Sequence, residues 1–202
     1  RAGYFTHYAG EGTIRSAKLS YKGEEVDLCL CRTKAHFSQE GKLRILTLDP
    51  VTIEFADLTV TLQTKEYFKE GSGAIGIERT ILDMSDSSAE IELNEYMTAC
   101  YGTTEYPEDM SGMLLSCEGT SDSENRTISY EYRCREADLF GAKAVSAVIP
   151  AIETKVSMTA SDNADGYIRE GYAFSPMFTL GYKKILTDKE MFATWLKLEK
   201  AN

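Results

Sequence analysis

The 202-residue sequence predicts a single all-β domain, a large antiparallel sandwich of about a dozen strands. Apolar and polar side chains alternate in run after run, which is the two-residue period of a half-buried strand. Gly, Pro, Asp, Asn and Ser separate these runs, as expected for turns. No window combines a helical period with capping residues. One domain, residues 1–202, fits the length because all-β sandwiches often reach this size undivided.

The alternation is clearest in the first half of the chain. The runs Ile75–Ile81 and Ala89–Met97 flank the polar segment Asp83–Ser88, and we expect them to form a hairpin-like pair. Shorter alternating runs precede them. Strands are expected there at Thr13–Tyr21, Val26–Arg32, Lys42–Leu48, Val51–Phe55 and Leu58–Leu62.

The second half contains shorter strand-like runs separated by longer polar stretches. Strands are expected at Met113–Glu118, Thr127–Arg135, Ala144–Ile149, Ile152–Met158, Met177–Ile185 and Glu190–Leu198. Three stretches rich in Gly, Ser, Asp and Tyr are expected to be irregular: Tyr101–Gly112, Gly119–Asn125 and Ser161–Ser175. Loops of this kind carry function more often than strands do.

The charge balance argues against two classes of partner. The formal net charge of −10 repels polyanions, so nucleic acid is not expected as a partner. No run approaches the ~20 consecutive apolar residues that a membrane-spanning helix needs, and no basic amphipathic stretch suggests a surface helix. The composition therefore predicts a soluble domain with no membrane partner.

Cysteine usage predicts a reducing, cytoplasmic setting. The five cysteines are an odd number and do not show disulfide-framework or zinc spacing. Cys29 and Cys31 lie two residues apart, so in a strand they would share one face as small buried hydrophobes. The chain opens Arg-Ala-Gly-Tyr without an initiator Met or signal peptide, which suggests a trimmed or excised piece of a longer protein.

The residues offer little catalytic chemistry. His7 and His36 are the only histidines, which leaves almost nothing for a nucleophilic triad or a histidine-rich metal site. The glycines of Gly71–Gly76 precede a strand instead of a helix, so they do not form a nucleotide-binding loop. We therefore predict no catalytic residue, no metal and no cofactor. Arg79 stands in an apolar run, where a buried charge needs a partner, and we expect a structural ion pair.

The segment Tyr101–Met110 is the densest mixture of acids and aromatics. Sugar sites combine aromatic faces with polar groups at their edges, so Tyr101, Tyr106 and Asp109 are the candidate substrate-binding residues. An acidic, solvated loop without a binding role is the alternative reading of the same residues.

Four segments carry a resemblance to a known family. Ile77–Tyr96 resembles a strand–turn–strand with an Arg-bearing first strand, and Tyr106–Leu115 resembles a His-Pro-x-Phe segment in which Tyr106 replaces the His and the Phe is absent. Arg135–Gly141 resembles a segment that precedes later strands, and Phe174–Leu196 resembles a closing hairpin. Together they resemble the N-terminal super-sandwich, or galactose-mutarotase-like, domain of the cellobiose-phosphorylase family, glycoside hydrolase family ninety-four, and of related glucan enzymes.

This resemblance implies a role beside a catalytic partner. The parent enzyme would be an inverting glycoside phosphorylase that transfers a glucosyl unit between a β-glucoside or β-glucan and inorganic phosphate. Its catalytic acid would lie on a separate helical barrel, so this chain would be non-catalytic. The implied partners are a β-glucoside or oligosaccharide, the helical catalytic domain and, as a homodimer, a second copy. The alternatives are a free-standing carbohydrate-binding or structural β-sandwich and, disfavoured by the scarcity of His, a sugar epimerase or lyase.

Overall fold

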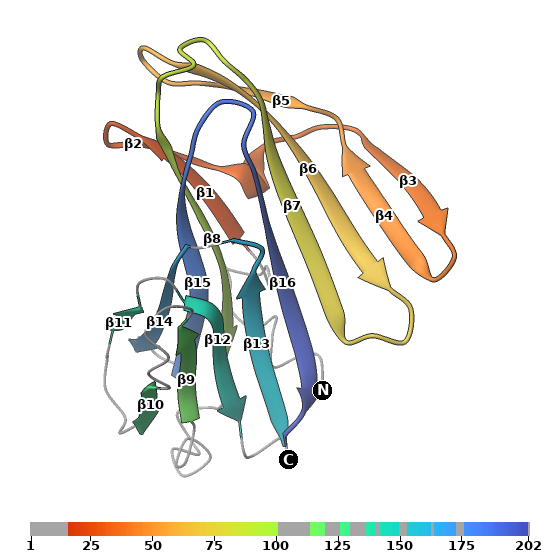
Figure 1. The fold of residues 1–202 in the computed structure, drawn as a ribbon, viewed down its shortest axis with the longest axis vertical. Helices are drawn as coiled ribbons and strands as arrows, with labels where there is room; N and C mark the ends of the chain where they lie inside the picture. The colour runs from red at the N-terminus through yellow and green to blue at the C-terminus, as the bar shows by residue number, and fades with distance from the viewer. Residues whose placement is uncertain are drawn as a thin grey trace.

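A computed structural model describes residues 16–100, 114–119, 126–129, 136–139, 142–149, 153–162, 164–172 and 176–201. These residues form sixteen strands, and the one helical element among them is a three-residue 3-10 turn, η2 (Figure 1). The predicted all-β sandwich is confirmed. No helix in the described residues is long and apolar enough to cross a membrane.

The strands follow one another through short connections. The first half contains β1 (Ser16–Tyr21), β2 (Glu24–Asp27), η2 (Leu28–Leu30), β3 (Ala35–Glu40), β4 (Leu43–Leu48), β5 (Val51–Glu54), β6 (Thr59–Lys69), β7 (Ala74–Met84) and β8 (Ile91–Cys100). The second half contains β9 (Leu114–Gly119), β10 (Arg126–Ser129), β11 (Glu136–Leu139), β12 (Ala142–Ile149), β13 (Thr154–Ala160), β14 (Asp165–Tyr172), β15 (Pro176–Leu186) and β16 (Met191–Lys200).

The strands form two antiparallel sheets of unequal width. The six-stranded sheet has the order β11-β14-β15-β8-β1-β2. The ten-stranded sheet has the order β10-β9-β12-β13-β16-β7-β6-β4-β3, and β5 pairs with β6 beside this path. In Figure 1, β3 and β4 lie to one side, away from the strands of the six-stranded sheet.

The hydrophobic core lies between the two sheets. Alternate residues of each long strand are buried, as the period of two requires. The core residues that are completely buried in the described strands are Ala17, Leu19, Val60, Ile81, Ile91, Leu93, Met97, Val145, Ala147, Val156, Met158, Leu180, Tyr182 and Leu186. The Tyr182 hydroxyl of β15 donates a 2.9 Å hydrogen bond to the Met158 carbonyl of β13, so this polar contact also joins the two sheets.

The expected hairpin between Ile75–Ile81 and Ala89–Met97 is wrong. Strand β7 pairs with β6 and β16, whereas β8 pairs with β1 and β15 in the other sheet. The connection between them therefore crosses from one layer to the other. The expected closing hairpin of Phe174–Leu196 is wrong for the same reason, because β15 and β16 also belong to different sheets. Alternation determines which face of a strand is apolar, but not which strand it pairs with.

The β7-to-β8 crossing brings two charged side chains together inside the sandwich. The Arg79 Nε donates to Glu95 Oε2 across the layers at 3.1 Å, and an Arg79 terminal nitrogen donates to Thr64 Oγ1 at 2.6 Å. Arg79 is 7% exposed and Glu95 is 1% exposed. The expected structural ion pair of Arg79 is confirmed, and its partner is a residue of the opposite sheet.

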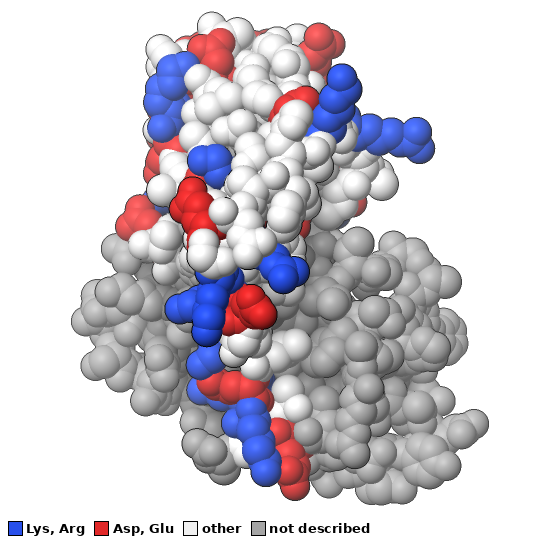
Figure 2. Space-filling view, turned by 90° about the vertical axis from the view of Figure 1, so that its right-hand side faces the viewer, with Lys and Arg blue, Asp and Glu red and all other residues white. Residues whose placement is uncertain are grey.

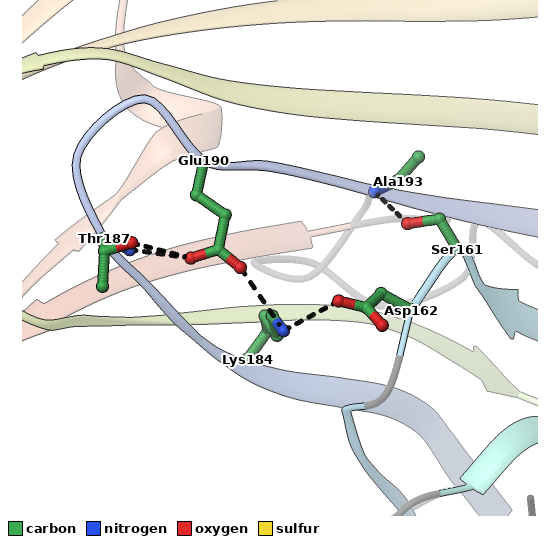
Figure 3. Close-up of polar contacts among 6 residues, drawn as sticks. All are labelled: Ser161, Asp162, Lys184, Thr187, Glu190 and Ala193. Carbon is green, nitrogen blue, oxygen red and sulfur yellow. Dashed lines mark hydrogen bonds and ion pairs between the residues drawn. The ribbon is translucent and has the colours of Figure 1, made fainter.

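Two other crossings between the layers are tied together by a polar cluster (Figure 3). Lys184 of β15 lies 3.2 Å from Asp162, which follows β13, and 3.4 Å from Glu190, which precedes β16. Partial burial lowers the pKa of Lys184, but Asp162 and Glu190 outweigh this, so the pKa is raised and the charged form is held. Glu190 also accepts hydrogen bonds from the Thr187 backbone N–H and hydroxyl. We assign this cluster a structural role.

Several local expectations need correction. The strand expected at Val26–Arg32 ends at Asp27, because its carboxylate accepts from the Cys29 backbone N–H and caps η2. Cys29 is consequently exposed and Cys31 is half-buried, so they are not the buried strand pair we expected, although both are free thiols. The side chains of the other three cysteines lie outside the described residues.

Strands were also missed where alternation is weak. Residues 161–175 were expected to be irregular, but β14 occupies Asp165–Tyr172 despite two glycines and three charged residues. Strands β3 and β11 were not predicted either. Every residue of β3 is exposed, so its sequence carries no apolar period.

Candidate functional site

The residues predicted to bind substrate are not among those that the structure describes. Tyr101, Tyr106 and Asp109 all fall between the end of β8 and the start of β9, outside the described ranges. Their role therefore stays a prediction. The described residues that best fit a sugar-contact surface lie elsewhere, on the outer face of the ten-stranded sheet.

Three residues on adjacent strands form an aromatic platform on that face. Tyr67 of β6 and Trp195 of β16 are both directly opposite Gly76 of β7 in the strand register. Opposed residues point to the same face of a sheet. Because Gly76 has no side chain, the two rings meet above it, with their centroids 5.9 Å apart and their planes tilted by 31°. Tyr67, Gly76 and Trp195 are called the aromatic platform below.

The platform is partly open to solvent. Trp195 is 38% exposed, and Tyr67 is half-buried. A Cβ atom at Gly76 would lie 2.5 Å from Trp195 Cζ3, so the indole ring covers the β7 backbone at this point. An aromatic ring over a cross-strand glycine is a packing solution in sheets, and that role explains why the rings meet here. The remaining exposed indole surface is available to a ligand.

Polar groups lie beside the platform, one row further along the strands. The Tyr67 hydroxyl donates to Glu78 Oε2 at 2.9 Å, and Lys65 Nζ lies 3.5 Å from Glu78 Oε1. Desolvation and the neighbouring Glu78 carboxylate raise the pKa of Tyr67 to about 12. The phenol therefore remains a protonated donor at neutral pH. Together these side chains give an acceptor, a cation and an aromatic surface within one small area.

The sequence gave only part of this site. Trp195 is the one Trp of the chain, and the alternation of β16 places it opposite the buried Phe192, Thr194 and Leu196. An outward-facing Trp on a strand was therefore a signal that could have been used. The meeting of Tyr67 with Trp195 could not be predicted, because it depends on the pairing of β6, β7 and β16.

A second location, a cleft inside the sandwich, is too small for a sugar. It measures about 20 Å³ and is lined by residues that include Leu28, Cys31, Asp49, Thr64 and Arg79. This is room for about one water molecule. The Arg79 guanidinium at its wall is already engaged by Glu95 and Thr64.

The described part of the chain offers no metal centre. No group of three or more His, Cys, Asp or Glu side chains lies close enough to hold an ion within it. His36 Nε2 lies 2.7 Å from Asp49 Oδ1, but both side chains are exposed and no third ligand joins them among the described residues. On the side shown in Figure 2, charges of both signs are interspersed over the described surface.

The two unequal antiparallel layers define an antiparallel super-sandwich, and solved structures share this fold. The protein Slr1438 from Synechocystis sp. PCC 6803 superposes with a TM-score of 0.60 at 10% identity, covering 91% of this chain and 73% of that one. The proposed mutarotase YeaD from Salmonella typhimurium gives 0.59 at 8% identity, covering 84% of this chain and 64% of that one.

A longer glycosidase contains the same fold as one part of its chain. The α-N-acetylgalactosaminidase NagBb from Bifidobacterium bifidum matches with a TM-score of 0.61 at 9% identity, covering 92% of this chain but 31% of that one. At such identities the likeness establishes the fold alone. No protein-family model and no curated protein sequence matches this chain. The mutarotase-like super-sandwich expected from the resemblance is thus confirmed, and the phosphorylase family is not.

Proposed function

We propose that this chain is the non-catalytic β-sandwich domain of a carbohydrate-active enzyme and that it contacts sugar through the aromatic platform. The observation that carries the proposal is the joint surface of Tyr67 and Trp195, with Glu78 and Lys65 at its margin. The fold likeness to YeaD and NagBb supports it. In NagBb the matching region is about a third of the chain, which is the arrangement expected of an accessory domain.

The chemistry of the platform suits a neutral pyranose. The C–H face of a sugar ring is apolar and can cover an aromatic ring, while its hydroxyl groups need acceptors and donors at the edge. Glu78 supplies the acceptor and Lys65 supplies donors. The site is open and buries only one face of a ligand, so we expect weak, millimolar binding.

The substrate class is a further part of the proposal. The resemblance of Ile77–Tyr96 and Tyr106–Leu115 to the cellobiose-phosphorylase family supports a parent phosphorylase acting on β-glucosides or β-glucans, with its catalytic acid on a helical domain. Tyr101, Tyr106 and Asp109 would then be a second sugar contact. A free-standing carbohydrate-binding or structural sandwich remains the alternative.

Replacing Trp195 with Ala is expected to weaken binding of a soluble β-glucan by at least about tenfold, because it removes the exposed indole surface on which a sugar would stack. NMR titration of the full chain would measure this. Leu198→Ala, on the same strand and with a 37% exposed side chain, is the matched control and should bind as the wild type does. Tyr106→Ala tests the second contact. If Trp195→Ala binds normally while Tyr106→Ala does not, the sugar site lies in the loop and not on the platform.

The chain by itself is expected to turn over neither β-glucosides nor free aldoses. Phosphorolysis requires an acid and a phosphate site around one glycosidic oxygen, and the described residues present no such arrangement near the platform. The measurement is phosphate release from glucose 1-phosphate with glucose or a β-glucan as acceptor. A parallel polarimetric assay of glucose mutarotation tests the epimerase reading, which the likeness to YeaD favours. Turnover in either assay would contradict the non-catalytic assignment.

A further inference from the structure

The outer edge of β3 is the least protected strand edge in the described structure. Five strands in the described ranges pair on one side only, and four of them, β2, β5, β10 and β11, span four residues each. Strand β3 spans six residues and pairs with β4 without a register shift. Proteins usually shorten, charge or bulge their edge strands, because an open edge is a template for another strand.

Strand β3 also buries none of its side chains. All six residues from Ala35 to Glu40 are exposed, and Phe37 is 63% exposed. Its one described attachment is the hairpin with β4. A hairpin with little apolar burial offsets poorly the conformational entropy of ordering its residues. A second strand on the free edge would supply the missing burial and backbone hydrogen bonds.

The sequence of β3 is complementary to itself in one antiparallel register. With Ser38 of two copies placed opposite each other, His36 of each copy faces Glu40 of the other, and Phe37 faces Gln39. The two Phe37 rings are then diagonal neighbours on one face, within reach of each other. No like charges are opposed in this register. The described surface on this side, to which β3 belongs, is mainly uncharged in its upper part with both signs at its borders (Figure 2).

We propose that β3 is a self-association edge, through which two copies of this chain pair in antiparallel fashion about a two-fold axis at Ser38. The two ten-stranded sheets then continue into each other across the dimer. His36 uses Nε2 for Asp49 of its own chain, and Nδ1 points the remaining donor capacity of the ring toward Glu40 of the second copy. The inference rests on the edge geometry and is independent of sugar binding.

A cysteine placed on the axis tests the register. Directly opposed residues have Cα atoms about 4.5–5.5 Å apart, which is within the ~4.4–6.8 Å range of disulfides. Ser38→Cys is therefore expected to form a covalent dimer on mild oxidation, whereas Gln39→Cys, which faces Phe37, should not. The wild-type chain, oxidised in parallel, gives the background from its own cysteines. Cross-linking of Gln39→Cys in preference to Ser38→Cys would overturn the proposed register.

A charge swap at the same position tests the association without oxidation. Ser38→Lys and Ser38→Glu each place like charges opposite each other, so each alone should associate several-fold more weakly than the wild type by analytical ultracentrifugation. An equimolar mixture of the two should restore the dimer. Ser38 is exposed, so both variants are expected to fold, and circular dichroism checks this. A wild-type chain that is monomeric at all concentrations, or a mixture that stays as weak as the single variants, overturns the proposal.

Discussion

Replacing Glu95 with Leu is expected to lower the free energy of unfolding by about 3–5 kcal/mol, because it leaves the buried Arg79 guanidinium without its counter-charge. Arg79 is 7% exposed and lies between the sheets, so water cannot take the place of the carboxylate without opening the sandwich. Thr64 would remain as a neutral acceptor only. The measurement is the urea midpoint at constant slope.

Two further variants separate the charge effect from the general effect of mutation. The double variant Arg79→Met with Glu95→Leu replaces the pair by apolar groups and is expected to recover most of the loss, since a buried pair often contributes little net stability. Glu25→Gln removes the acidic partner of the exposed Lys18 and should cost about 0–1 kcal/mol. A loss below about 1 kcal/mol for Glu95→Leu would mean that Arg79 finds solvent or another partner.

Substituting Ala for Gly181 is expected to destabilise the chain by about 1–3 kcal/mol through overpacking. Gly181 of β15 lies directly opposite Tyr167 of β14 and Tyr96 of β8. A Cβ atom there would lie 2.4 Å from Tyr167 Cζ and 2.5 Å from its hydroxyl oxygen. The ring cannot easily move aside, because Tyr167 is 2% exposed and its hydroxyl donates to Asn94 at 2.8 Å.

Gly76 provides the matched control on the other sheet. It is also flanked by two aromatic residues, and a Cβ atom would lie 2.5 Å from the ring of Trp195. Trp195 is 38% exposed, so the indole can move outward. Gly76→Ala should therefore cost less stability than Gly181→Ala in the same denaturation experiment, while disturbing the aromatic platform and its sugar binding. Equal losses at the two glycines would contradict this account of ring mobility.

The aromatic platform and the buried ion pair have a common origin in strand order. Each joins residues far apart in the sequence through the pairing or stacking of strands that are not hairpin partners. Gly76 is opposed by residues 67 and 195, and Arg79 of one sheet meets Glu95 of the other. Positions that look ordinary along the chain thus become a surface or a clasp once the sheets are assembled.

The sequence by itself determined the class of the fold and most of the long strands. Period-two alternation is a local property of each strand, so it identified β7, β8 and β16 and the buried position of Arg79. It failed at β3 and β14, where exposure or glycine removes the apolar period. Cysteine exposure was misjudged because a local cap at Asp27 ended the strand early.

Only the tertiary structure decided which strands are neighbours. Turn composition between β7 and β8 is compatible with either a hairpin or a crossing between layers, and the outcome depends on burying both apolar faces against each other. That choice placed Glu95 opposite Arg79 across the core and set Tyr67 and Trp195 on either side of Gly76. The candidate sugar surface was therefore beyond sequence reasoning, because it is made by register and pairing, which no single strand encodes.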